Sequence, residues 1–237
     1  MKSQSQFKTL LLLMFILFYV LPAHSQQNRN LPLANFQEIS VSSGIDLYLS
    51  QGNTESVKVV AHEDLIDNVI VEKSGSSLKV KYKDNISWSR LLQNQSIKVY
   101  ITCKKITAIN ASGGSDVYGQ NTLKTNTINI SASGGSDITL SLATQNLELR
   151  TSGGSDVDLK GKAVNMNASL SGGSDIEALE LLVDYAKVNA SGGSDAKVNV
   201  EKGLQADASG GSDVYYKGNA SLKKTSTSKS GDVKKLK

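Results

Sequence analysis

The residues with the greatest chemical potential in this sequence are six aspartates, each ending the same pentapeptide, Ser-Gly-Gly-Ser-Asp. Carboxylate and hydroxyl oxygens are the ligands that Ca²⁺ prefers, and one ion takes about six to eight of them. Neighbouring copies of the motif could each supply part of such a shell. The sequence therefore offers a calcium ladder as one use of the motif. Its candidate ligands are Asp116, Asp137, Asp156, Asp175, Asp195 and Asp213.

The spacing of these aspartates indicates which element positions them. Successive motif aspartates are 21, 19, 19, 20 and 18 residues apart, and a shortened copy places Asp232 another 19 residues on. An internal repeat of this kind is the signature of a solenoid, in which each repeat forms one rung. Aliphatic and polar residues alternate on both sides of each motif, which is the period of a β-strand. We therefore predict an all-β fold, a parallel β-solenoid over residues 104–217 with about 19 residues per rung, preceded by an N-terminal β-rich segment. The general crossover preference favours a right-handed coil.

The glycines of the motif have a structural interpretation that needs no ligand. In a parallel stack, identical positions lie about 4.8 Å apart, so a side chain at a tight corner meets the next rung. Glycine permits a positive φ or a bulge there, and Ser and Asp side chains can close the turn on backbone N–H groups. The corner and the calcium ladder are alternative uses of the same motif. The predicted corner residues are Gly113, Gly114, Gly134, Gly135, Gly153, Gly154, Gly172, Gly173, Gly192, Gly193, Gly210 and Gly211.

Catalytic arrangements find little support in the sequence. After residue 25 the chain has one histidine, His62, so no set of histidines is available for a zinc site. The phosphate-binding string Gly-x-x-x-x-Gly-Lys-Ser/Thr does not occur. Two carboxylates can hydrolyse a glycoside, and Asp156 with Asp158 on one strand is a pair of that type. Because such a pair is more often a solvated face, we predict that the protein is not an enzyme.

Aromatic side chains, which can form platforms for sugar rings, are scarce. Tyr118, Tyr215 and Tyr216 stand beside the first and last intact motifs, and Trp88 stands in a segment that interrupts the strand pattern. These four residues are candidates for contact with a glycan. They are equally candidates for caps over the ends of the coil.

Residues 1–25 have the features of a cleaved secretory signal. Lys2 and Lys8 precede a 13-residue apolar run, and small residues follow at the cleavage position. The run is short for a bilayer of about 30 Å, so we expect no membrane segment after cleavage. Cleavage lowers the formal net charge from +4 to +2, which does not favour a nucleic-acid partner. The single cysteine, Cys103, excludes an internal disulfide and is expected to be buried.

The rest of the chain divides into three parts. We predict an N-terminal β-rich part at residues 26–110, the repeat solenoid at residues 111–217 and a lysine-rich tail at residues 218–237. The tail is interpreted as a solvated terminus, with contact to anionic lipid or polysaccharide as the alternative. Within the first part, residues 61–68 predict a helical turn at most, and residues 83–95 predict a loop or short helix.

Several of these strings together resemble a known family. The segment FQEISVSSGIDLYLSQG at residues 36–52, with SLKVKY, SIKVYIT and the serial SGGSDV strings, is similar to the auto-transporter adhesin head domain called GIN, found in exported proteins common in Bacteroidetes. The resemblance covers roughly residues 31–217. Within it, SSGIDLYL places Asp46 where the motif has its aspartate. The resemblance implies a β-helix-like fold and an adhesive role outside the cytoplasm, and it implies no catalytic residues.

We therefore expect an exported, non-enzymatic, adhesin-like protein that presents repeating Ser, Asp and Asn side chains to a surface protein or a glycan. The alternative is a structural protein of the cell envelope whose repeats serve only the fold, and a polysaccharide-active enzyme is a weaker hypothesis. We expect the periplasm, the outer-membrane surface or the medium as its location, and no cofactor unless calcium binds. An uncovered strand at one end of the solenoid also predicts a homodimer through that edge.

Overall fold

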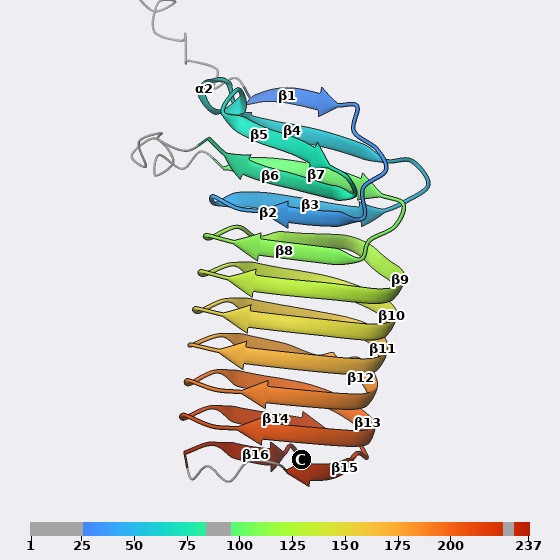
Figure 1. Ribbon diagram of the computed structural model, residues 1–237, viewed down its shortest axis with the longest axis vertical. Helices are drawn as coiled ribbons and strands as arrows, with labels where there is room; N and C mark the ends of the chain where they lie inside the picture. The colour runs from blue at the N-terminus through green and yellow to red at the C-terminus, as the bar shows by residue number, and fades with distance from the viewer. Residues whose placement is uncertain (1–25, 84–95, 225–229) are drawn as a thin grey trace, which may run out of the picture.

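The computed structural model describes residues 26–83, 96–224 and 230–237, and almost all of this chain is β-strand. Its strands form one hydrogen-bonded sheet that winds into a coil (Figure 1). The only helix among the described residues is α2 (Glu63–Ile66), which is the helical turn predicted within residues 61–68. The predicted all-β, parallel β-solenoid is confirmed.

Five long strands form the regular coils of the solenoid. Each pairs in parallel with the next, and the register joins equivalent residues, so that Asp137 lies opposite Asp156 and Asp156 lies opposite Asp175. The repeat in the sequence is therefore the repeat of the coil. The five strands are β9 (Val117–Ser133), β10 (Asp137–Ser152), β11 (Asp156–Ser171), β12 (Asp175–Ala190) and β13 (Asp195–Ala208).

Each long strand bends halfway along, so that a coil has two flat faces around a narrow interior. The half that begins with the motif aspartate, residues 137–144 in β10, lies on what we call the post-motif face. The half that ends at the motif serine, residues 146–152, lies on the pre-motif face, which is turned toward the viewer in Figure 1. Burial alternates along both halves and changes phase between Thr144 and Leu147, which marks the bend.

The side chains that the two faces turn inward form one hydrophobic core along the whole solenoid. The residue after each motif aspartate and the first and third residues before each motif serine are buried in every coil, as the alternation predicts. Full burial of one aliphatic side chain stabilises the fold by about 1.5–3 kcal/mol. A single rung cannot achieve this burial, because its neighbours above and below provide the cover.

The order of the coils differs from the order of the chain at the N-terminal end. The strands β2 (Glu38–Val41) and β3 (Ile45–Gln51) form one coil that lies between two later ones. On one side it pairs in parallel with β6 (Ser77–Tyr82) and β7 (Ile97–Cys103), and on the other with β8 (Ala108–Ser112) and β9. Residues about 70 positions apart therefore lie side by side in this coil.

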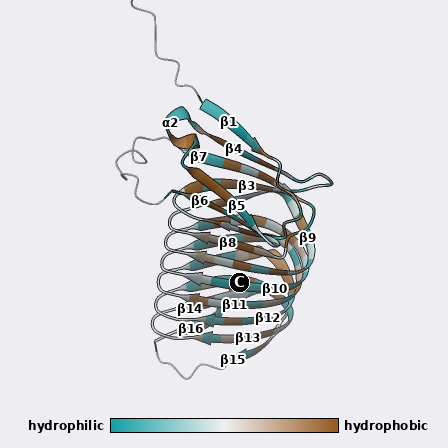
Figure 2. Cartoon of the chain, turned by 45° about the horizontal axis from the view of Figure 1, so that its top comes forward, coloured by the Kyte–Doolittle hydropathy of each residue, from teal (hydrophilic) through white to brown (hydrophobic). Residues whose placement is uncertain are grey.

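Antiparallel strands cover the N-terminal end of the core. The strand β4 (Ser56–His62) pairs with β7, β1 (Gln26–Leu31) pairs with β4, and β5 (Val69–Ser74) pairs with β6, all antiparallel. The helix α2 buries Leu65 and Ile66 beside them. Figure 2, in which this end comes forward, shows α2 and these strands over the stack.

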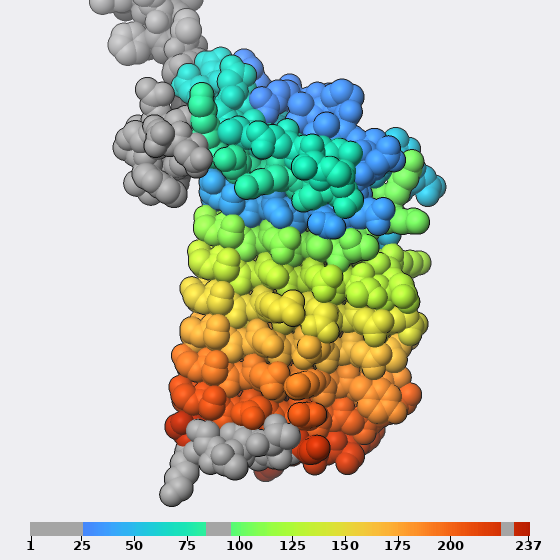
Figure 3. Space-filling model, viewed as in Figure 1, coloured from blue at the N-terminus to red at the C-terminus, as the bar shows by residue number. Residues whose placement is uncertain are grey.

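The C-terminal end continues the coil beyond the last intact motif. The strand β15 (Ser221–Lys224) pairs in parallel with β13, and β16 (Asp232–Lys235) pairs in parallel with β14 (Asp213–Lys217). Asp232 lies opposite Asp213, so the shortened seventh copy begins a further coil. The segment predicted as a lysine-rich tail thus contributes two strands, and Figure 3 shows the chain descending in successive bands to this end.

No helix among the described residues is long and apolar enough to cross a membrane. Cys103 is buried as expected, and burial raises the pKa of its thiol to about 11. The predicted signal at residues 1–25, Trp88 and most of the predicted loop at residues 83–95 lie outside the described residues.

Candidate functional site

The motif glycines lie at the corner where the chain passes from the pre-motif to the post-motif face. Eleven of the twelve have φ between 61° and 87°, and Gly173 alone does not have a positive φ. A Cβ on the first glycine of a motif, such as Gly172, would lie 2.9 Å from the backbone nitrogen of Gly153 in the preceding coil. A Cβ on the second glycine, such as Gly135, would meet nothing within 4 Å. The first glycine thus serves close stacking, and the second serves only the backbone conformation.

The second serine of each motif is completely buried at the same corner. The Ser136 hydroxyl donates to the carbonyl of Ser133 at 3.0 Å, which closes the turn. The Ser155 hydroxyl accepts the backbone N–H of Ser136 at 3.1 Å, which links two coils. A buried polar group needs such partners, so these serines belong to the scaffold. The buried set is Ser115, Ser136, Ser155, Ser174, Ser194 and Ser212.

The motif aspartates point outward and form a continuous column, which we call the acidic file. Its first member is Asp46, which is level with Asp116 because Leu47 lies opposite Val117. Carboxylates accept backbone N–H groups from the next coil: Asp175 Oδ1 accepts from Asp195 N at 3.2 Å, and Asp195 Oδ1 accepts from Asp213 N at 2.9 Å. The acidic file comprises Asp46, Asp116, Asp137, Asp156, Asp175, Asp195, Asp213 and Asp232.

Crowding of like charges is detectable in this file. Desolvation, and to a smaller extent repulsion from Asp116, raises the pKa of Asp46. Attraction to the ammonium group of Lys98 partly offsets this increase. Desolvation and repulsion from Asp116 and Asp156 raise the pKa of Asp137. Within residues 26–83, 96–224 and 230–237, no three His, Cys, Asp or Glu side chains are grouped closely enough to hold a metal ion. Calcium binding by the file stays a prediction.

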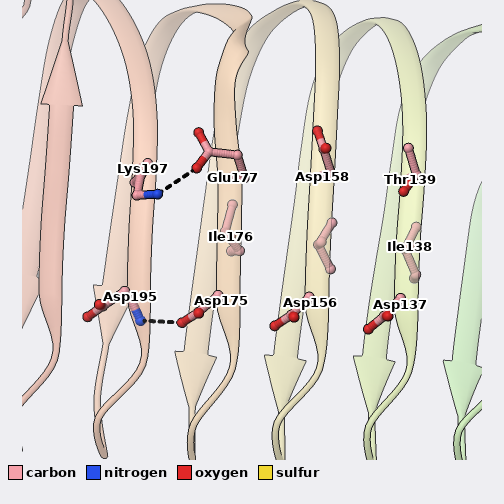
Figure 4. A pocket seen from close by; sticks show the side chains of 11 residues that line it. Asp137, Ile138, Thr139, Asp156, Asp158, Asp175, Ile176, Glu177, Asp195 and Lys197 are labelled. Carbon is pink, nitrogen blue, oxygen red and sulfur yellow. Dashed lines mark hydrogen bonds and ion pairs between the residues drawn. The ribbon is translucent and has the colours of Figure 1, made fainter.

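A shallow groove of about 390 Å³ runs beside the acidic file on the post-motif face (Figure 4). Its other wall is the column two residues further along each strand, which includes Asp158, Glu177 and Lys197. Lys197 Nζ lies 2.8 Å from Glu177 Oε2. Asp156 and Asp158, the predicted carboxylate pair, are both exposed in this groove, one in each wall. The groove is therefore an open polar surface, and a catalytic role for the pair stays a hypothesis.

Three tyrosines stack at the N-terminal end of the column that forms this second wall of the groove. The ring centroids of Tyr48 and Tyr100 are 4.9 Å apart, and those of Tyr48 and Tyr118 are 5.4 Å apart. The Tyr118 hydroxyl donates to Asp116 Oδ2 at 3.1 Å, and burial together with that carboxylate raises the pKa of Tyr118 to about 12. Because the rings cover one another's faces, they join β7, β3 and β9 at the point where the chain order changes.

Tyr118 was singled out from the sequence, but it was not predicted that Tyr48 and Tyr100 lie in one stack with it. The echo of the motif in SSGIDLYL was the available signal, because it aligns Tyr48 with Tyr118. The other candidates lie at the far end: the Tyr215 hydroxyl donates to Asp213 Oδ2 at 2.7 Å. Tyr216 is buried, as a cap would be.

The pre-motif face carries mainly hydroxyl and amide side chains in columns. Asn165 Nδ2 donates to Asn146 Oδ1 at 2.9 Å, and Asn167 Nδ2 donates to Glu148 Oε2 at 2.9 Å. A groove of about 490 Å³ beside the corner is lined largely by serines of five successive coils. This face therefore offers many hydrogen-bonding groups and few unpaired charges.

Residues 35–220 of the chain match the family described as "Putative auto-transporter adhesin, head GIN domain". The chain belongs to this family. The match includes β4, β5 and α2 at the N-terminal end, the coil formed by β2 and β3 and all the regular coils, but not β1. The resemblance expected from the sequence is therefore confirmed over nearly the same residues. No curated protein is detectably similar to the chain.

Solved structures share the GIN fold with this chain. A putative adhesin from Bacteroides fragilis has a TM-score of 0.82 at 23% identity, covering 91% of this chain and 99% of its own. A putative adhesin from Parabacteroides distasonis has a TM-score of 0.73 at 20% identity, covering 90% and 98%. A protein of the same species described as a putative lipid binding protein has a TM-score of 0.72 at 18% identity, covering 91% and 98%. At these identities the likeness establishes the fold alone.

Proposed function

We propose that this GIN-domain protein is an exported, adhesin-like binding protein whose coil faces present Ser, Asp and Asn side chains to a protein or glycan partner. The observation that carries the proposal is a division of roles within each repeat. The glycines and the second serine are used by the backbone of the corner, whereas every second side chain between corners points outward and lies in a column with its equivalents in other coils. Columns of this kind let several weak contacts act on one extended partner.

Two further observations support the proposal. The family is described as an adhesin head, and the sequence predicts a signal at residues 1–25 that would export the chain. The described residues place the exposed carboxylate pair in an open groove rather than in an enclosed pocket, which favours binding over catalysis.

Retention of protein-coated beads on cell surfaces and on immobilised polysaccharides tests this function. Beads coated with the folded protein should be retained more strongly than beads coated with the heat-unfolded protein. Protease or periodate treatment of the surface then distinguishes a protein partner from a glycan. Equal retention of folded and unfolded protein on every surface would overturn the proposal.

A structural role in the cell envelope is the second candidate, and the extensive internal use of the motif favours it. In that case, substitutions in the outward columns leave retention unchanged, and loss of the protein weakens the envelope. The bead experiment therefore separates the two functions.

A further inference from the structure

Tyr185 is the most exposed large apolar side chain among the described residues, with 52% of its surface accessible. It lies on β12 where that strand bends onto the pre-motif face, and Leu182 of the same coil is 38% exposed. In the other regular coils, β9, β10, β11 and β13, no large apolar side chain is exposed to this extent. The coil turns these two positions outward, as it does Lys162 and Asn165 opposite them in β11, but the fold does not require large apolar side chains there.

The register of β12 is irregular against both of its neighbours. Against β11 it shifts between Asp158 and Lys160, and against β13 it shifts on both sides of Leu182 and Val183. Bulges of this kind redirect side chains and are over-represented next to functional sites. Tyr185 lies opposite Asn165 of β11 and Gly203 of β13, so it occupies a column that faces outward in every coil. The irregular register and the aromatic side chain in this column together mark this coil as different from the rest.

A groove of about 450 Å³ opens beside Tyr185. Asn165 contributes from β11, Lys187 from β12 and Gln205 from β13, so three successive coils form its lining. Gly203 lies opposite Tyr185, and a Cβ at that position would lie 3.2 Å from the Tyr185 ring. Glycine therefore leaves the ring room to lean over the next coil.

The charges around the ring exclude a cationic ligand. Lys202 Nζ lies 5.7 Å from the centroid of the Tyr185 ring and 2.8 Å from Asp184 Oδ2, so this ammonium group is already paired. Lys187 and Lys223 line the groove, and no carboxylate does. The remaining polar lining groups are amides, hydroxyls and backbone.

An exposed aromatic ring beside planar amides is the chemistry that recognises a sugar. The C–H groups of a pyranose are attracted to the negative face of an aromatic ring. Its hydroxyls need donors and acceptors placed at the edge of that contact, which amide side chains supply. We propose that Tyr185, Asn165 and Gln205 form a binding site for one hexopyranose unit of a glycan. This site rests on the proposed function, and it names the partner class and the place.

Saturation-transfer NMR with the methyl glycosides of glucose, galactose, mannose and N-acetylglucosamine tests the site on the purified protein. We expect at least one of them to receive saturation from the wild-type protein. Tyr185→Ala should weaken its binding at least about tenfold, because one well-placed contact is worth this much. Tyr185→Phe keeps the ring and should retain most of the binding, and Asn165→Ala should weaken it without changing the melting temperature.

Tyr100→Ala is the matched control, because Tyr100 is a 40% exposed tyrosine outside this groove. It should leave binding unchanged. Equal binding by the wild type and Tyr185→Ala would overturn the site, as would the absence of saturation transfer to all four glycosides. If protein-coated beads are still retained in either case, the adhesive function stands and only the site is wrong. If the beads are not retained, both proposals fail.

Discussion

The two edges of the solenoid differ in how much freedom they leave the sequence. At the corner edge, every intact coil uses the same five residues, and φ, close stacking and buried hydroxyl bonds account for the glycines and the second serine. At the bend edge, around residues 145, 164, 184 and 202, the coils carry Gln, Val, Asp and Lys, and the register between β12 and β13 shifts there. The repeated glycines and buried serine thus mark what the backbone needs. On the proposed function, the differences between the coils would be the places where a partner is recognised.

Gly161 gives the strongest test of this difference between the corner edge and the bend edge, because it lies away from the corner yet has φ of 110°. A Cβ there would lie 2.1 Å from the carbonyl oxygen of Leu142. We expect Gly161→Ala to destabilise the protein by about 3 kcal/mol or more, since strained φ and a backbone clash add. Gly154→Ala at the corner, where only φ is strained, should cost about 1–2 kcal/mol. Urea unfolding followed by circular dichroism measures both, and an equal loss would contradict the clash.

Ser155→Ala tests the buried hydroxyls of the corner. In the wild type, the Ser155 hydroxyl accepts the backbone N–H of Ser136 at 3.1 Å, and the substitution removes this acceptor. We expect a loss of about 1–3 kcal/mol, the cost of an unsatisfied buried group. Ser152→Ala, at the partly exposed first serine, should change the free energy of unfolding by no more than about 0.5 kcal/mol. Equal effects of the two would show that burial does not distinguish the serines.

Asp137→Asn sharpens the account of the acidic file. The folded-state pKa of Asp137 is raised, so the folded protein binds its proton more readily than the unfolded chain does. Its charge therefore costs stability at neutral pH, and this cost disappears as the pH falls through the raised pKa. We expect the variant to be more stable than the wild type at pH 7 by a few tenths of a kcal/mol. Melting curves in acid should show the difference vanishing, and a growing difference would contradict the sign.

Calcium gives the smallest expected effect. Several carboxylates of the file already accept backbone N–H groups, so we expect the same melting temperature in millimolar calcium and in chelator. A ligand bound only to the folded state raises that temperature once its concentration exceeds the dissociation constant. A clear rise with calcium would establish the calcium ladder instead.

The sequence was sufficient to predict the architecture because each copy of the repeat independently predicts one coil of the solenoid. The six intact motifs and their alternating flanks predicted the coil and the positions that face inward. The string SSGIDLYL predicted that Asp46 stands at the aspartate position of the motif. The inserted coil of β2 and β3 was not predictable in the same way, because periodicity says nothing about which coil lies beside which. The stack of Tyr48 with Tyr100 depends on that order and was missed for the same reason.

Tyr185 was missed for a different reason. The alternation places it outward, because the adjacent Ala186 faces the core, but it does not distinguish this outward side chain from the others. That the neighbouring coil places a glycine, Gly203, opposite the ring depends on the pairing of β12 with β13, whose register shifts between Val183 and Tyr185. The role of Gly203 could not be predicted either, because it depends on the Tyr185 ring that lies opposite it.

The identity of the corner in every coil makes the length of the molecule adjustable. Because Ser133 and Ser152 occupy equivalent positions one coil apart, removal of the chain between them leaves two ends that can join and two layers that can stack. The N-terminal end does not share this freedom, because its inserted coil of β2 and β3 bonds to residues about 70 positions later in the chain. Such a chain can gain or lose height in steps of one strand spacing, about 4.8 Å, while its capped end stays the same. The fold thus permits changes of length by whole coils, and each such change would alter the distance of a distinctive coil such as β12 from that end.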